Sequence, residues 1–127
     1  MIEWLQEAVT SLLLLLGAAL MLLAAVGAIR LPDLLTRMHA TTKAGALGAA
    51  LTVAGVAVHF ADAGVTARAV AIIAFIFLTA PVAAHLIGRA GYFVGVPLWD
   101  GTIKDELKPH YDELNHSLRS GLEERDD

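Results

Sequence analysis

The sequence predicts an all-α integral membrane protein with three transmembrane helices, and three observations carry this prediction. Of its 127 residues, 57% are hydrophobic and only 17% are charged, which is less charge than soluble domains usually carry. The apolar residues gather in three runs, 8–29, 44–61 and 69–88. Each run is close to the roughly 20 residues that cross a hydrocarbon core about 30 Å thick. The basic residues lie outside these runs, and nearly all of them fall on one side.

The first element is a transmembrane helix over residues 8–29, a run without any charged residue. Glu3 and Glu7 precede it, whereas a secretory signal peptide begins with a basic region. The run is also long enough to span a bilayer, so we expect a permanent helix rather than a cleaved signal. The five leucines at 12–16 predict a surface that faces lipid.

The second element is expected to begin at Pro32 and to continue to about residue 61. Proline suits the first position of a helix, and an acid such as Asp33 suits the positive N-terminal end. Asp33 and Arg37 lie four residues apart with the acid first, which favours an ion pair. Small residues further along predict a face that packs closely on another helix. These small residues are Ala46, Gly48, Ala50, Ala54 and Gly55.

The third element spans about 68–90 and contains Pro81, which leaves the carbonyl of Phe77 without its helical donor and predicts a kink. Thr79 lies close enough to satisfy a local carbonyl. His85 shares a helix face with Arg89, four residues later. One interpretation is that it relays protons or bridges to a neighbour's carboxylate. The second is that it is a packed interfacial histidine. The second reading is favoured, because no acid in this chain is placed to pair with it.

The distribution of charge predicts the orientation. Eight of the nine Lys and Arg residues flank the spans on one side, and only Arg68 lies on the other. Since basic loops remain inside, we expect the N-terminus outside and the C-terminus in the cytoplasm. Residues 1–92 would then form the transmembrane domain, with spans at about 8–29, 32–61 and 68–90, and residues 93–127 a cytoplasmic tail. Apolar residues at helical spacing predict a short amphipathic helix in this tail. They are Leu107, Tyr111, Leu114, Leu118 and Leu122.

The charged segment between the first two runs carries a resemblance to a known family. GAIRLPDLLTRMHATTKAGALG, residues 27–48, combines a Pro-Asp pair, an Arg before Met-His-Ala, and a Lys shortly before Leu-Gly. This pattern resembles the signature of the MnhG/PhaG family, the G subunits of the multisubunit Mrp-type sodium/proton antiporters. LTAPVAAHLIGRAGY, residues 78–92, is similar to the third span of that family. Related subunits also occur in membrane-bound hydrogenase complexes.

The resemblance implies an accessory membrane subunit that supports assembly and ion exchange in a hetero-oligomeric antiporter. The complex would exchange Na+, or another monovalent cation, for H+. Its partners would be the other subunits and the lipid bilayer, and its place the inner or plasma membrane, as a multi-pass protein. Two alternatives stay open. One is the equivalent small subunit of a hydrogenase-type complex, and the other is an assembly or regulatory protein with no part in ion movement.

The residues themselves favour an accessory role. Ion carriers usually place carboxylates or lysines inside the membrane, whereas the only titratable residues within the three runs are His59 and His85. The chain has no cysteine, and no two histidines lie four residues apart, so we expect no metal or cofactor and no enzymatic activity. An acidic tail and a net charge of −4 disfavour nucleic acid as a partner.

We expect the polar residues of the charged segment, and those of the cytoplasmic half of the third span, to contact other subunits or to lie near an ion path. These candidates are Arg30, Pro32, Asp33, Arg37, His39, Lys43, Thr79, Pro81, His85 and Arg89.

Overall fold

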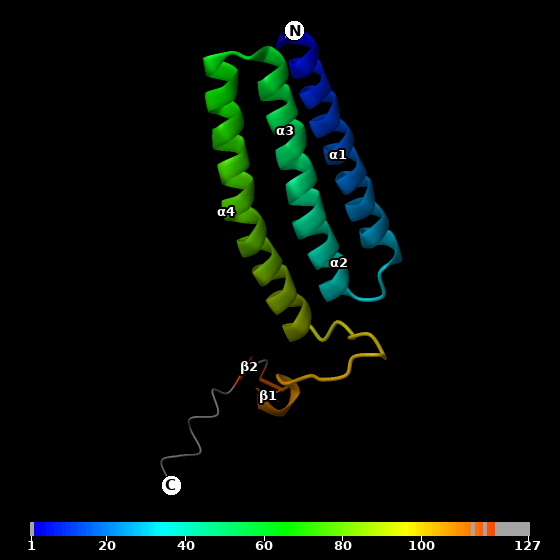
Figure 1. The fold of residues 1–127 in the computed structure, drawn as a ribbon. Helices are drawn as coiled ribbons and strands as arrows, with labels where there is room; N and C mark the ends of the chain where they lie inside the picture. The colour runs from blue at the N-terminus through cyan, green and yellow to red at the C-terminus, as the bar shows by residue number, and fades with distance from the viewer. Residues whose placement is uncertain (1, 113, 116, 119–127) are drawn as a thin grey trace.

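The computed structural model describes residues 2–112, 114–115 and 117–118, and it confirms an all-α membrane fold with three long helices (Figure 1). Each helix is long and apolar enough to cross a membrane. The second helix is continuous but consists of three segments, one of them a single π turn. The elements are α1 (Ile2–Arg30), then α2 (Leu34–Ala40), η1 (Thr41–Gly45) and α3 (Ala46–Phe60), which together form the second helix, and α4 (Ala63–Phe93).

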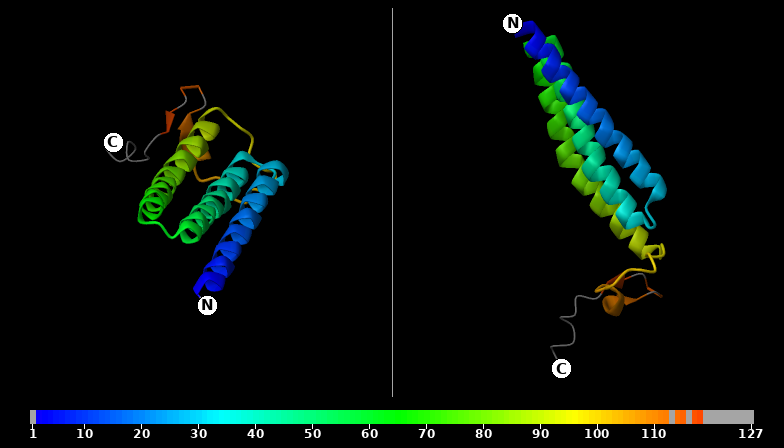
Figure 2. Two further views of the ribbon diagram at one scale, coloured as in Figure 1. Left: turned by 90° about the horizontal axis from the view of Figure 1, so that it is seen from above. Right: turned by 45° about the vertical axis from the view of Figure 1, so that its right-hand side comes forward.

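The three helices form a flat layer with the second helix in the middle. Both α1 and α4 pack against the second helix, and they lie on opposite sides of it (Figures 1 and 2). Few side chains are buried in this layer, and all of them are small. Most large apolar side chains, such as those of Leu15 and Leu78, are instead exposed on its surfaces. In a membrane these surfaces meet lipid or other proteins.

Close backbone approach between glycines holds α1 to α3. A Cβ atom built on Gly17 would lie 2.8 Å from the carbonyl oxygen of Gly48, and one on Gly48 would lie 2.8 Å from the carbonyl oxygen of Gly17. A Cβ atom built on Gly55 would lie 3.1–3.3 Å from side-chain atoms of Leu13 and Leu14. The predicted packing face is therefore confirmed for these two glycines of α3, and its partner is α1.

The second helix begins at Leu34, so the expected start at Pro32 is wrong. Asp33 is the N-cap, with extended backbone angles of φ −126° and ψ 166°. Its carboxylate accepts the backbone N–H of Thr36 at 2.7 Å and the Thr36 hydroxyl at 2.6 Å. A capping residue must leave the helical conformation to make these bonds. Asp33 therefore ends the turn, and Pro32 lies outside the helix.

At the other end of the layer, Gln6 ties α1 to the second helix. Its side-chain amide donates to the carbonyls of Val58 and His59 at 2.8 and 2.9 Å. Such carbonyls have no partner within a helix, since they belong to its last turn. Ala61 then ends the helix in the left-handed conformation, and Asp62 caps α4 by accepting from the backbone N–H of Val65 at 2.9 Å. Both turns thus close with an aspartate cap.

The described part of the tail does not form the expected amphipathic helix. A short 3-10 helix, η2 (Lys108–His110), leads into two paired strands, β1 (Tyr111–Asp112) and β2 (Ser117–Leu118). Two hydrogen bonds accompany this fold, one of them to the end of α4. Tyr111 donates its hydroxyl to the carbonyl of Phe93 at 2.7 Å, and the Asp112 carboxylate accepts the N–H of Leu114 at 2.9 Å, which is a turn geometry. Leu122 lies outside the described residues.

Candidate functional site

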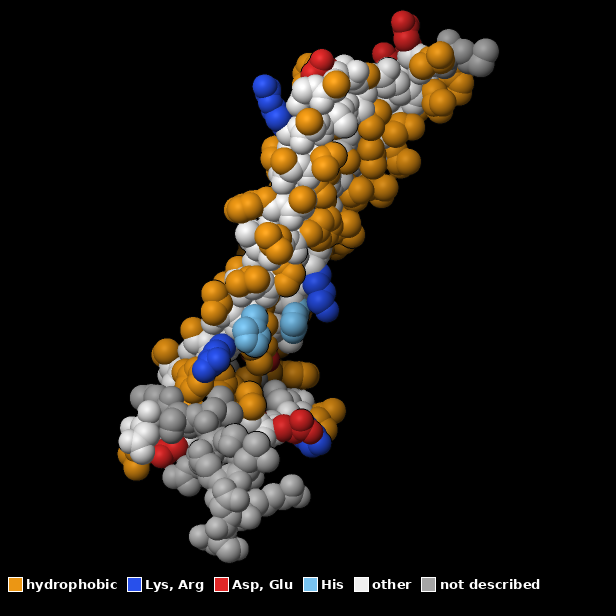
Figure 3. Space-filling model, turned by 90° about the vertical axis from the view of Figure 1, so that its left-hand side faces the viewer, with side chains coloured by type: hydrophobic (Ala, Val, Ile, Leu, Met, Phe, Trp, Pro, Cys, Tyr) orange, Lys and Arg blue, Asp and Glu red, His pale blue; other side chains and the backbone are white. Residues whose placement is uncertain are grey.

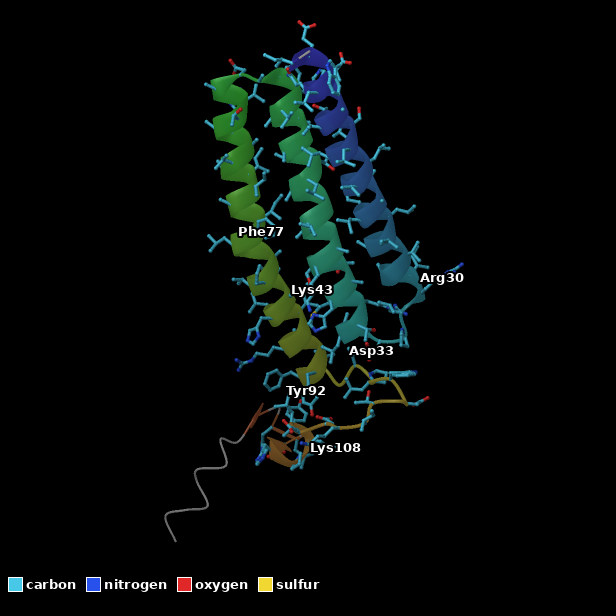
Figure 4. The ribbon with its side chains drawn as sticks, viewed as in Figure 1. Arg30, Asp33, Lys43, Phe77, Tyr92 and Lys108 are labelled. Atoms are coloured by element: carbon cyan, nitrogen blue, oxygen red, sulfur yellow. The ribbon has the colours of Figure 1, made fainter. Side chains whose placement is uncertain are left out.

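The structure places most of the candidate residues in two groups. Figure 4 shows Arg30 and Asp33 at the turn that joins α1 to α2, and Lys43 on the second helix beside α4. The first group, which we call the charged turn, consists of Arg30, Pro32, Asp33 and Arg37. The second group lies in the seam between the second helix and α4.

Within the charged turn, Asp33 and Arg37 do not form the expected ion pair. The Arg37 side chain instead donates from Nε to the carbonyl of Leu31 at 2.7 Å, and no ion pair between Arg37 and Asp33 occurs in the described chain. The carboxylate of Asp33 is occupied by Thr36, and its backbone is not helical, so the spacing of four does not bring the charges together. Arg37 therefore stabilises the turn through the backbone of Leu31.

The environment of Asp33 keeps it ionised. The Thr36 hydroxyl, and next the Thr36 backbone N–H, donate to the carboxylate and hold its pKa below the ordinary value of 3.8. Burial opposes this shift by raising the pKa, and the backbone N–H of Trp99 and the charge of Arg37 make smaller contributions that lower it. A fixed negative charge thus remains at the turn at neutral pH.

The first part of the tail folds back onto this end of the layer. The backbone N–H of Trp99 approaches the Asp33 carboxylate at 3.4 Å. The hydroxyl of Tyr92 donates to the carboxylate of Asp105, with oxygen distances of 3.0 and 3.1 Å. Asp33 and Trp99 are 66 residues apart, so helical periodicity carried no signal for this contact.

The seam between the second helix and α4 contains a hollow that we call the basic groove. It consists of two adjoining cavities of about 440 and 600 Å³, which share Met38, Ala84 and His85. In Figure 4 Lys43 and Phe77 lie along this seam. Figure 3, turned by 90° from that view so that the side of α4 faces the viewer, shows histidine side chains next to each other between Lys or Arg side chains. The residues of the groove used below are His39, Lys43, Phe77, Pro81, His85 and Arg89.

The basic groove brings together side chains that the sequence placed on separate helices. His39 and Lys43 come from the second helix, and His85 and Arg89 come from α4; all four are exposed. Among the described residues that line the groove, none is Asp or Glu. The Arg89 guanidinium also lies 5.2 Å from the centre of the Phe93 ring, a cation–π arrangement that fixes its position.

A π turn shapes the second-helix side of the groove. Residues Thr41–Gly45 form this wider turn, a feature that often occurs at functional sites. The Thr41 hydroxyl donates to the carbonyls of Arg37 and Met38 at 3.1 and 3.0 Å, and the Thr42 hydroxyl donates to Met38 at 2.6 Å. The neighbouring threonines therefore satisfy carbonyls around the widened turn. This pair of threonines is the signal that could have indicated an irregular helix.

Thr79 and Pro81 lie near the middle of α4, which continues through the proline. Thr79 donates its hydroxyl to the carbonyl of Phe75 at 2.7 Å. The expectation that Thr79 satisfies a local carbonyl is confirmed, although the acceptor is not Phe77. Pro81 lines the basic groove, whereas Thr79 is not among its lining residues.

The sequence of this chain is similar to those of known proteins. A family model described as Na+/H+ antiporter subunit, PhaG_MnhG_YufB, matches residues 13–92. The G subunit of the Na+/H+ antiporter from Alkalihalophilus pseudofirmus is 38% identical over 109 residues, which cover 84% of this chain and 92% of that protein.

Two solved complexes contain a similar chain. One chain of the Mrp complex from Dietzia sp. matches with a TM-score of 0.78 and 26% identity, over 82% of this chain and 94% of that one. A chain of the membrane-bound sulfane sulfur reductase, an archaeal respiratory complex, matches with a TM-score of 0.73 and 35% identity, over 87% and 99%.

Proposed function

Because this chain belongs to the PhaG_MnhG_YufB family of Na+/H+ antiporter subunits, we propose that it is an accessory subunit of a monovalent cation/proton antiporter complex. In this role it supports assembly of the complex and exchange of Na+ for H+, as a multi-pass protein of the cell membrane. The family is one of transport proteins rather than of enzymes, and we propose that the chain has no catalytic activity of its own.

The flat layer of helices is the observation that supports an accessory role. Three helices in a row enclose no water path, because α1 and α4 lie on opposite sides of the second helix (Figure 2). Between Ala46 and Phe60, and between Ala69 and Gly88, the chain carries no Asp, Glu, Lys or Arg. Since ion transfer through a membrane usually requires such groups, the ions pass through other subunits or between this chain and a neighbour.

The charged turn is the proposed docking surface for a neighbouring subunit. Arg30 and Arg37 are exposed there, and the ionised carboxylate of Asp33 lies between them in the sequence. Hydrogen bonds to backbone groups hold the side chains of Asp33 and Arg37 in place, and side chains that are fixed before binding lose little entropy when they bind. Under the proposed orientation the charged turn and the tail, residues 93–127, face the cytoplasm, and residues 1–92 form the membrane domain.

A respiratory complex is the second candidate for the parent assembly. The observation in its favour is the similarity to a chain of the sulfane sulfur reductase, which is 35% identical over 87% of this chain. The same three-helix layer therefore occurs in a complex of a different activity. The identity of the co-purifying subunits distinguishes the two assemblies.

Purification from native membranes tests the proposal. A tag on this chain, mild detergent and mass spectrometry should recover the other antiporter subunits. Reconstituted into liposomes with a pH-sensitive dye, the complex should release protons on addition of Na+, and the chain alone should not. Na+-dependent proton flux by the chain alone would contradict the accessory role. Recovery of redox subunits instead of antiporter subunits would favour the respiratory assembly.

A further inference from the structure

The basic groove has the shape and charge of a lipid site. Its walls are apolar over most of their length, with Leu47, Phe77 and Pro81 among the lining residues. Four basic side chains line the rest of it: His39, Lys43 and His85 in the cavity that also contains Phe77, and Arg89 in the cavity at the end where α4 leaves the membrane. A groove with apolar walls and basic side chains fits a molecule with an acyl chain and an anionic headgroup.

The extent of the groove matches one leaflet of a bilayer. From Phe77 to Arg89 the helix advances about 18 Å at 1.5 Å per residue, and one leaflet contributes about half of a 30 Å core. On the second helix the lining ends at Leu47, so Gly48–Phe60 lies outside it. A partner's transmembrane helix would cross both leaflets, whereas a lipid occupies only one.

The charge of the groove selects an acidic headgroup. Lys43 and Arg89 supply two cationic side chains, and His39 and His85 supply further N–H donors. One acid, Asp105, contacts Tyr92, which lines the groove. Its carboxylate is already occupied by other donors, because it also accepts the backbone N–H groups of Leu107 and Lys108 at 3.1 and 3.2 Å. A zwitterionic headgroup carries an ammonium group, which these cationic side chains would repel. The groove therefore favours an acidic headgroup.

From these observations we propose that the basic groove binds an acidic phospholipid from the leaflet at its Arg89 end. The phosphate lies where the two cavities meet, at His85, which lines both. Its oxygens accept hydrogen bonds from His85 and from the basic side chains on either side, His39 and Lys43 in one cavity and Arg89 in the other. One acyl chain lies along Phe77 and Pro81. The site depends on the groove alone, whether the parent assembly is an antiporter or a respiratory complex.

Native mass spectrometry of the purified complex tests this site. The complex, purified through a tag on another subunit and stripped of lipid, is titrated with phosphatidylglycerol and with phosphatidylcholine. The double variant Lys43→Gln/Arg89→Gln should bind phosphatidylglycerol about tenfold more weakly than the parent. The control Lys104→Gln/Lys108→Gln removes the same charge from exposed tail positions outside the groove, and it should bind like the parent. Inorganic phosphate, which lacks an acyl chain, should not compete.

Crosslinking in the otherwise native chain locates the occupant even where the charge variants fail to assemble. A photoreactive residue in place of Ala80, which lines the groove, should crosslink to phospholipid. A crosslink to another subunit would overturn the proposal, as would equal binding of the two lipids or unchanged binding by the groove variant. Retention of this chain in the complex, measured in the same samples, separates these outcomes from a failure of the accessory role.

Discussion

At the scale of single residues, Asp33 does most to define the charged turn. Asp33→Ala removes the acceptor of two Thr36 hydrogen bonds, and loss of such a cap typically lowers the free energy of unfolding by about 1 kcal/mol. Asp33→Asn retains a capping oxygen and serves as the control. Thermal denaturation of the purified protein, followed by circular dichroism, should show a lower midpoint for the alanine variant only. Equal midpoints for the two variants would mean that the cap is unimportant.

The contribution of this cap should depend on pH. The folded pKa of Asp33 lies below 3.8, so the ionised cap contributes its stability above that value and loses it as the pH falls through the lower, folded pKa. The difference in midpoint between the parent and Asp33→Ala should therefore be constant near neutral pH and shrink in acid below pH 3.8. A difference that grew on acidification would reverse the sign expected from these hydrogen bonds.

Arg37 tests whether the charged turn does more than set the orientation. Arg37→Lys keeps the positive charge but loses the Nε–H that donates to Leu31, and lysine does not reproduce arginine's planar fork. We expect normal insertion but reduced retention of the chain when the complex is purified through another subunit. Arg68→Lys, the same exchange on the opposite side of the membrane, is the control. If both variants assemble like the parent, the charged turn serves only as a topology signal.

At the scale of helices, the contact between α1 and α3 should tolerate no side chain at Gly48. A Cβ there would lie 2.8 Å from both the Gly17 carbonyl oxygen and the Met21 Cγ, and such overpacking costs about 1–3 kcal/mol. Gly45→Ala is the matched control, because its Cβ would meet only Ala24 at 3.6 Å. Thermal denaturation should show a lower midpoint for Gly48→Ala and no loss for Gly45→Ala. A comparable loss in both would point to helix propensity rather than packing.

The helices were predictable from the sequence because each contains a long apolar run, and the glycine face of α3 was predictable because small residues recur along it. The groove was not. It depends on how far the second helix and α4 are shifted along each other, which places His39 beside α4 and His85 beside the second helix. The fold of the described part of the tail was predicted wrongly, because Tyr111 lies in a strand and bonds to Phe93 rather than taking part in a helix.

At the scale of the whole molecule, the orientation in the membrane is open to a direct test. The chain has no cysteine, so single cysteines can be introduced at two exposed positions, Ala63 at the start of α4 and Thr102 in the tail that follows the other end of α4. An impermeant maleimide should label the cysteine at position 63 in intact cells, and the cysteine at position 102 only after lysis. The reverse pattern would place the eight basic residues outside and contradict the positive-inside assignment.

The central position of the second helix has a consequence for biogenesis. The second helix is the least hydrophobic of the three spans, yet its glycines fit against α1, which leaves the ribosome first. The two can therefore enter the bilayer as a helical hairpin, fastened at the far end by Gln6 and at the middle by Gly17 and Gly48. Helix α4 joins this hairpin last. The seam with α4 is thus the last surface of the membrane domain to form, after the rest has been synthesised.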